Sequence, residues 1–356
     1  MPDISAIKQQ LESVAKKVLM AIDRPREREV IERRFGLAGT KETLEAVGEI
    51  LGITRERVRQ IEKATLIRTK IGLDDGKNPA FDAAEVEIVK ALHELGRGAR
   101  TDTLAQKLLN ANDTKARGVI TFLAELSNKM VATTENDRYY PAIVLTNDKE
   151  DKAVKQAVDK IVEALKQHGQ PVDKDGLFKL ASSAGLKYEH PDETAAIANI
   201  SKQIASLDSK WGLVKWPLVN PRNIRDKIYI VLQYAGKPTH FSDIAAAVKS
   251  QNFRRNNVTE QAIHNELIKD DRFILVGRGI YALSEWGYKK GSITDVIREI
   301  LRKESPLHRE EIVRRVLKVR QVREATVLLN LQNQKEFKRV AKAQYALDEP
   351  AAGTGK

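Results

Sequence analysis

Four polar side chains in the segment 54–61 are spaced for hydrogen bonding to the edges of nucleic-acid bases. Arg55 and Arg59 lie four residues apart, as do Glu56 and Gln60, so a helix would place each pair one turn apart on one side. Arginine can form two hydrogen bonds with guanine, glutamine can pair with adenine, and glutamate can accept from cytosine N4. All four residues are therefore candidates for contact with base edges.

Residues suited to phosphate binding surround these positions. Arg57 and Lys63 carry positive charges beside the candidate base-contacting residues, and such side chains commonly hold DNA phosphates. Thr43 and Thr54 stand where two helices are expected to begin, so a hydroxyl and free backbone N–H groups can both meet a phosphate there. We predict that these four residues contact the DNA backbone. The alternative interpretation is a solvated charged helix held by Glu–Arg pairs.

Two short helices joined at a tight turn would position these side chains. Gly48 stands where two helices must approach closely, and Gly52 stands at the expected turn. The apolar residues of the segment recur with helical spacing, at Val47, Leu51, Ile53, Val58 and Ile61. Because this apolar pattern and the polar face occur in the same segment, we predict a helix-turn-helix and favour base contact over a solvated face.

The run from 24 to 66 resembles region 4 of primary-type bacterial sigma factors. The resemblance is carried by the elements REREV, RFGL, TLEAVG and TRERVRQIE. It implies binding to the promoter −35 element and docking on the flap of the RNA polymerase β subunit. The resemblance also implies that Arg55, Glu56 and Gln60 contact bases. It implies backbone contacts by four further residues: Thr43, Thr54, Arg57 and Arg59. The apolar side of the earlier helices would supply core contacts and flap contacts, through Val30, Ile31 and Phe35.

One departure from that family changes the expected role. Complete sigma factors of this type have an aromatic-rich upstream region that binds and melts the −10 element. Here aromatic residues make up 5% of the chain, and none precedes Phe35. We therefore expect a regulator related to sigma factors, and not a factor that opens promoters by itself.

The rest of the chain repeats with a period of about 70 residues, which suits a tandem array of small domains. Residues 237–248 (KPTHFSDIAAAV) and 305–316 (SPLHREEIVRRV) match, as do 273–283 (FILVGRGIYAL) and 337–347 (FKRVAKAQYAL). Each copy has three expected helices followed by a β-hairpin, which predicts a winged-helix module. Two weaker copies occupy 81–145 and 151–219, the second with an expected helix over 193–207.

The last two copies resemble the HARE-type helix-turn-helix, a winged domain found in the delta subunit of some bacterial RNA polymerases. That resemblance implies DNA binding or polymerase association. The residues that carry it in the final copy are Pro306, Leu307, His308, Glu311, Ile312 and Tyr345-Ala346-Leu347. In the copy before it they are Pro238, His240, Asp243, Ile244 and Tyr281-Ala282-Leu283.

The predicted fold class is mainly α: a helix-turn-helix domain followed by a tandem array of winged-helix-like modules with small β-hairpin wings. The predicted domains are a region 4-like unit at 1–73, winged-helix-like modules at 80–147 and 151–220, and HARE-type winged helices at 222–286 and 291–349. A charged, turn-forming segment at 74–79 is the expected linker after the first unit.

The charge distribution supports a polyanionic partner. The chain has 356 residues and a net charge of +12. Residues 1–73 hold 15 basic and 11 acidic side chains (+4), and 80–220 hold 19 and 20 (−1). Residues 222–290 hold 12 and 7 (+5), and 291–349 hold 13 and 9 (+4). The excess positive charge lies toward the two ends, which is compatible with binding to a polyanion such as DNA. Ordinary fluctuation of charge on solvated faces is the alternative and explains the charge distribution equally well.

Basic residues in the last two modules are further candidates for DNA-backbone contact. Arg278 lies in a Gly-Arg-Gly sequence at an expected wing tip. Solvated surface charge is the alternative for each of these residues. His240 and His308 recur at one structural position, so we expect them to cap or pack a helix start and not to catalyse a reaction. The predicted contacts are Arg254, Arg255, Arg278, Arg314, Arg315 and Arg320.

Other classes of function find little support. The chain has no cysteine, and its six histidines show no metal-ligand spacing. Common nucleotide-binding, hydrolase and metalloprotease motifs do not occur. We therefore expect a cytoplasmic, non-enzymatic protein that needs no cofactor, small-molecule substrate or membrane. Its expected partners are double-stranded promoter-like DNA and the RNA polymerase β flap or core. The alternative is an interaction protein that mimics region 4 to bind polymerase, with little sequence-specific DNA binding.

Overall fold

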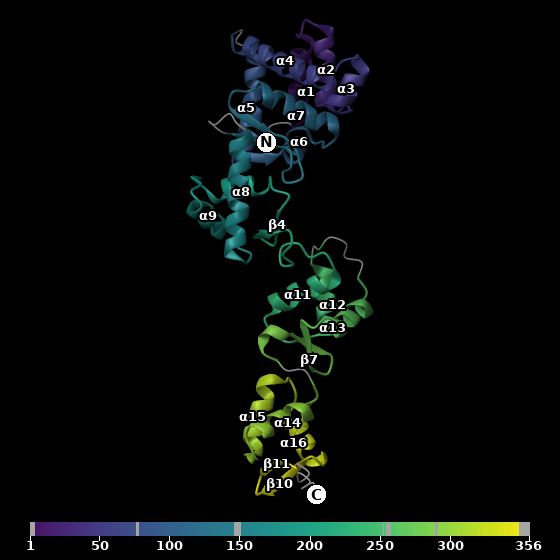
Figure 1. Ribbon diagram of the computed structural model, residues 1–356, viewed down its shortest axis with the longest axis vertical. Coiled ribbons are helices and arrows are strands. Elements are labelled where there is room, and N and C mark those ends of the chain that lie inside the picture. The colour runs from purple at the N-terminus through teal and green to yellow at the C-terminus, as the bar shows by residue number, and fades with distance from the viewer. Residues whose placement is uncertain are drawn as a thin grey trace, which may run out of the picture. The chain divides into compact units, whose positions relative to one another are not determined.

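The computed structural model describes residues 4–75, 78–145, 151–251, 253, 258–288 and 291–348 (Figure 1). The chain is mainly helical with small antiparallel sheets, as the sequence predicts at this level. It divides into two compact units, Met1–Asn220 and Pro221–Lys356. None of the helices in the described ranges has both the length and the apolar character that a membrane span requires.

The first unit begins with four helices: α1 (Ile4–Met20), α2 (Pro25–Phe35), α3 (Leu44–Leu51) and α4 (Arg55–Asp75). Pro25 occupies the first turn of α2, where its missing N–H costs nothing. α4 extends to Asp75, and Asn78 caps the next helix by accepting from the Phe81 N–H at 3.1 Å. The predicted linker is thus largely helix end and helix cap, although 76–77 lie outside the described residues.

The next group contains α5 (Pro79–Glu94), β1 (Gly98–Arg100), α6 (Thr101–Leu109), α7 (Thr114–Leu126), β2 (Met130–Thr133) and β3 (Ala142–Leu145). Its three strands form an antiparallel sheet in the order β1-β3-β2. α1 packs against α5, α6 and α7 (Figure 1), and residues of all four helices share one hydrophobic core. The first helix therefore contributes mainly to the core of the following group of helices.

The third group contains α8 (Asp151–His168), α9 (Lys174–Ser183), α10 (Pro191–Ala198), β4 (Ile204–Leu207) and β5 (Lys210–Leu213). The helix predicted over 193–207 is wrong at its end, because α10 stops at Ala198 and 204–207 form a strand. Ile204 faces Leu213 and Leu207 faces Lys210 across the hairpin. Backbone pairing with β5 thus overrides a pattern that is compatible with a helix.

The second unit contains two groups with the same order of elements. The first has α11 (Ile224–Ala235), β6 (Thr239–His240), α12 (Phe241–Ser250), α13 (Glu260–Lys269), β7 (Phe273–Gly277) and β8 (Ile280–Leu283). The second has α14 (Ile293–Lys303), β9 (Leu307–His308), α15 (Arg309–Val319), α16 (Glu324–Asn333), β10 (Phe337–Ala341) and β11 (Gln344–Leu347). The sheet orders are β6-β8-β7 and β10-β11-β9, so each hairpin gains a third strand that precedes the second helix.

The two recurrent histidines lie at matching helix starts. His240 Nδ1 accepts a hydrogen bond from the Ser242 N–H, and His308 Nδ1 accepts one from the Glu310 N–H, each at 3.4 Å. These residues are the N-caps of α12 and α15. The predicted capping role is confirmed, because an N-cap acceptor satisfies one of the free N–H groups of the first turn.

Candidate nucleic-acid interface

The candidate base-contacting residues lie together in the first two turns of α4. Arg55, Glu56 and Gln60 are all exposed, while Val58 between them is fully buried. Val58 packs with Val30 and Val47, and four partly buried apolar side chains surround them: Leu44, Leu51, Ile53 and Ile61. One helix face is therefore held by a small core, and the opposite face presents the polar side chains to solvent.

The turn between α3 and α4 depends on two glycines. A Cβ on Gly48 would lie 2.6 Å from the carbonyl oxygen of Ile53, so a side chain there would force the two helices apart. Gly52 has φ +63°, a left-handed conformation that glycine adopts without strain. Its N–H caps the end of α3. The sequence-based roles of both glycines agree with this geometry.

Arginines of α2 hold the helix pair in place. Arg34 forms an ion pair with Glu62 on α4 at 2.8 Å and donates to the carbonyl oxygen of Glu42 at 2.6 Å. Arg33 pairs with the Glu42 carboxylate at 2.9 Å, and Arg26 donates to the Leu51 carbonyl at 2.6 Å. Sequence reasoning did not assign these residues, and their basic character alone does not separate them from DNA contacts.

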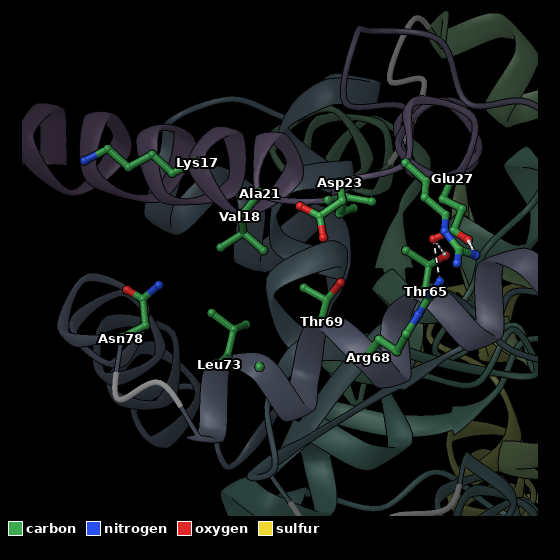
Figure 2. Close-up of a pocket in the computed structure, with 13 residues that line it drawn as sticks. Lys17, Val18, Ala21, Asp23, Glu27, Thr65, Arg68, Thr69, Leu73 and Asn78 are labelled. Atoms are coloured by element: carbon green, nitrogen blue, oxygen red, sulfur yellow. Dashed lines mark hydrogen bonds and ion pairs between the residues drawn. The ribbon is translucent and has the colours of Figure 1, made fainter.

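Glu27 anchors the middle of α4 to α2. Figure 2 shows its carboxylate directed toward Thr65 and Arg68, and it accepts hydrogen bonds from both. Arg24 pairs with the same carboxylate at 3.1 Å. The contacts lie at one end of a cleft of about 480 Å³ between α1 and the C-terminal half of α4. Together with the Arg34–Glu62 pair, they fix the direction in which the start of α4 projects.

Ion pairs link the exposed polar side chains to one another. Arg59 donates two hydrogen bonds to Glu56, at 2.8 and 2.7 Å, and these lower the pKa of Glu56. Arg55 pairs with Glu45 of α3 at 2.6 Å, and Arg57 donates to the Gln60 side chain at 3.3 Å. Each pair is more than half exposed or lies among exposed side chains, so solvent weakens it and a stronger partner can replace it.

The candidate phosphate-contacting residues occupy the helix starts and the flank of α4. Thr43 accepts from the Ala46 N–H and Thr54 from the Arg57 N–H, both at 3.2 Å. The Thr43 hydroxyl also donates to the Glu45 side chain, and a phosphate would have to replace Glu45 as its acceptor. Lys63 is exposed on the same helix, one turn beyond Arg59. The structure thus gathers all eight candidates of the first unit on α4 and at the start of α3.

The apolar residues that the resemblance assigned to core and flap contacts are buried. Val30 and Ile31 are 0% exposed and Phe35 is 8% exposed. The Phe35 ring meets Phe122 of α7 edge-on, with ring centroids 5.4 Å apart. The core assignment is correct: Val30 packs with Val47 and Val58, whereas Ile31 and Phe35 belong to the core shared with α1 and α7. In this structure none of the three side chains offers an exposed surface to another protein. The sequence held no local sign of this long-range contact.

The candidates in the second unit fall into different environments. Arg278 is exposed at the turn between β7 and β8. Arg314 pairs with Glu311 at 2.6 Å, and Arg315 pairs with both Glu311 and Glu304, at 2.6 and 2.8 Å. Arg320 is only 5% exposed, so a phosphate can reach it only if its surroundings rearrange, and its predicted contact with DNA stays a prediction. The remaining two candidates, Arg254 and Arg255, lie outside the described residues.

Acid is expected to weaken the ion-pair cluster on α15. Hydrogen bonds from Arg314 and Arg315 lower the pKa of Glu311 to about 2, below its unfolded value of about 4.3. The folded pKa is depressed, so the stabilisation is complete above about pH 4.3 and is lost as the pH falls toward 2. The thermal midpoint of wild type minus that of Glu311→Gln should therefore shrink over this range. Glu310→Gln, at a neighbouring exposed carboxylate, is the control. The difference in thermal midpoint between wild type and this variant should change less over the same pH range.

The geometry defines the class of this site as a helix-turn-helix with an exposed polar second helix. Residues 24–68 match the family model described as Sigma-70, region 4. This segment therefore forms a Sigma-70 region 4 domain, and the resemblance seen in the sequence is confirmed over these residues. The match covers the helix pair, the α2 arginines and the Glu27 anchor.

Sigma factors are among the relatives that match part of the chain. The chain is 40% identical over 70 residues to the chloroplastic RNA polymerase sigma factor sigF of Arabidopsis thaliana, which covers 19% of this chain and 13% of that protein. It is 44% identical over 66 residues to RNA polymerase sigma factor SigA of a Nostoc species, 18% of this chain and 17% of the relative. It is 54% identical over 43 residues to RNA polymerase sigma factor SigA of Microcystis aeruginosa, which covers 12% of this chain and 10% of that protein.

These matches cover less than a fifth of this chain and of each of the three relatives. The similarity therefore describes the region 4 domain and not the whole protein. No solved structure matches the chain.

Proposed function

We propose that this chain is a DNA-binding transcription regulator related to sigma factors, which recognises a −35-like promoter element through Arg55, Glu56 and Gln60. Thr43, Thr54, Arg57, Arg59 and Lys63 hold the flanking phosphates. The exposed polar start of α4, opposite the buried Val58, is the observation that carries the proposal. Arginine, glutamate and glutamine there supply the donors and acceptors that major-groove base edges require.

The groups that follow the region 4 domain are, in this proposal, winged-helix modules. The group from α5 to β3, and the two groups of the second unit, have a helix, a short strand, two helices and a hairpin in that order. The group from α8 to β5 has three helices and a two-stranded hairpin. The five-domain division and the HARE-type relationship of the last two modules stay predictions. Arg278 is the best-placed wing residue for a phosphate, because it is exposed at a hairpin turn.

RNA polymerase is a second proposed partner, and it also underlies the alternative function of a region 4 mimic. The Sigma-70 region 4 match supports both ideas equally. Burial of Ile31 and Phe35 against α1 and α7 argues against a contact through those side chains. The exposed residues of α4 remain available to DNA, which favours DNA recognition as the main role.

Selection from random-sequence duplexes by the full-length chain tests this proposal. We expect a −35-like element to be enriched, and the selected duplex to bind more tightly than a shuffled duplex at every salt concentration. Both should weaken as salt rises, because phosphate contacts release counterions. If the chain bound the two duplexes with equal affinity, its DNA binding would be nonspecific and the proposed recognition of a −35-like element would be wrong. The region 4 mimic would be supported by two results together. The chain would capture RNA polymerase even after charge reversal at Arg55 and Arg59, and it would show no preference between the two duplexes.

A further inference from the structure

Arg320 is a buried cation at the contact between the two groups of the second unit. Its Nη1 donates to the carbonyl oxygen of Leu275 on β7. The neighbouring Gln321 N–H donates to the Val276 carbonyl at 3.1 Å, and the Gln321 carbonyl lies against Gly277. The segment after α15 is therefore bonded directly to β7 of the preceding group.

The guanidinium of Arg320 is poorly satisfied in this position. Its Nε and Nη2 are buried and have no hydrogen-bond partner. Burial lowers the pKa of Arg320, and Asp295 is the carboxylate that opposes this effect. Asp295 is already engaged with Ser292 and with Arg298, the latter at 2.7 Å. An ionised group buried without its own partners is unfavourable, so this site favours an added anion.

A cavity of about 1050 Å³ adjoins Arg320 between the same elements. Arg278, Arg320 and Arg323 all line it, and its described lining includes no aspartate or glutamate. No ion pair joins any of these three arginines to a carboxylate within the described ranges. The rest of the lining is largely apolar, apart from Gln321 and the hydroxyl groups of Ser292 and Thr326, of which the Ser292 hydroxyl already donates to Asp295. Three unpaired arginines around one cavity give it a strong preference for anions.

We propose that this cavity binds a phosphate group through Arg320, with Arg278 and Arg323 contributing positive charge. The Nε and Nη2 edge of a guanidinium presents two parallel donors that match two oxygens of a phosphate. Both nitrogens are closed to solvent in this structure, so binding in this proposal requires the Arg320 side chain to shift toward the cavity. The phosphate belongs either to a small phosphate ester seated in the cavity or to a DNA backbone held along it.

Titration calorimetry on the full-length chain tests this proposal, with deoxyadenosine monophosphate and a shuffled DNA duplex as separate probes. Arg320→Met is the variant, because methionine retains apolar volume and removes the unpartnered charge. We expect Arg320→Met to weaken binding at least tenfold for whichever probe the wild-type chain binds. The melting temperature of the variant protein should equal or exceed that of wild type. Lys303→Met, an exposed cation in the same unit with the same charge change, should bind like wild type.

The outcomes separate the two phosphate sources. If wild type binds the nucleotide saturably and Arg320→Met does not, the cavity is a site for a small phosphate ester. If the substitution weakens binding of the duplex alone, the cavity holds a phosphate of the DNA backbone. If wild type binds neither probe, or if Arg320→Met binds as wild type does, the proposal is overturned. The site lies outside the region 4 domain, so Arg55→Ala should leave nucleotide binding intact. Failure of the recognition-helix proposal is thereby distinguishable from failure of this one.

Discussion

Replacing both Arg55 and Gln60 with alanine is expected to weaken binding to the selected −35-like duplex by roughly 30-fold or more. Each bidentate contact with a base contributes about 1–3 kcal/mol of discrimination, so two such contacts contribute at least about 2 kcal/mol. The loss should appear mainly as lost sequence preference, because most phosphate contacts remain. Fluorescence anisotropy with selected and shuffled duplexes measures both affinities. The fold itself should change little, since both side chains are exposed.

A matched control exists on α8 of the same unit. Lys166 and Gln167 both contact Glu163, at 3.3 and 3.5 Å, much as Arg59 and Gln60 contact Glu56. Lys166→Ala with Gln167→Ala removes one exposed positive charge and one exposed amide, as the test variant does. If the test variant and this control bind both duplexes alike, the assignment of base contacts to α4 is wrong.

Gly118→Ala is expected to destabilise the first unit strongly. A Cβ at this position of α7 would lie 2.2 Å from the carbonyl oxygen of Phe35 at the end of α2. Backbone cannot yield as a flexible side chain does, so α7 and α2 must move apart. Overpacking of this kind costs about 1–3 kcal/mol, occasionally more. Hydrogen exchange should show faster exchange in α2 and α7, with a lower melting temperature of the unit.

Gly72→Ala is the control for this prediction. Gly72 also lies in a helix, but a Cβ there meets nothing within 4 Å. Alanine should therefore stabilise α4 by roughly 0.5–1 kcal/mol, because it reduces the freedom of the unfolded chain. The two variants carry the same chemical change and have opposite expected signs. Equal effects would show that α7 does not pack on the end of α2 as described.

Local patterns allowed much of the first unit to be predicted. The helix-turn-helix predicted from the apolar spacing of residues 47–61 corresponds to α3 (Leu44–Leu51) and α4 (Arg55–Asp75). Thr43, Gly48 and Gly52 have the cap, close-approach and turn roles that their types indicated. These features depend on residues within one or two helical turns, so their pattern is visible in a short window of sequence.

Predictions failed where contacts between distant residues decide the outcome. The segment 204–207 is compatible with a helix by itself and becomes β4 because it pairs with β5. The short strands β1, β6 and β9 went unrecognised, since each is defined by pairing with the last strand of its own group. A strand of two or three residues has no periodicity of its own.

The sequence by itself determined the region 4 domain, the turn between α3 and α4, and the polar face that Arg55, Glu56 and Gln60 share. Those features follow from helical spacing and from glycine's backbone freedom, which are properties of neighbouring residues. Only the tertiary structure decided which basic and apolar residues are accessible. It buries Phe35 under α7 and Arg320 against β7, because burial is set by elements that are remote in sequence and adjacent in space.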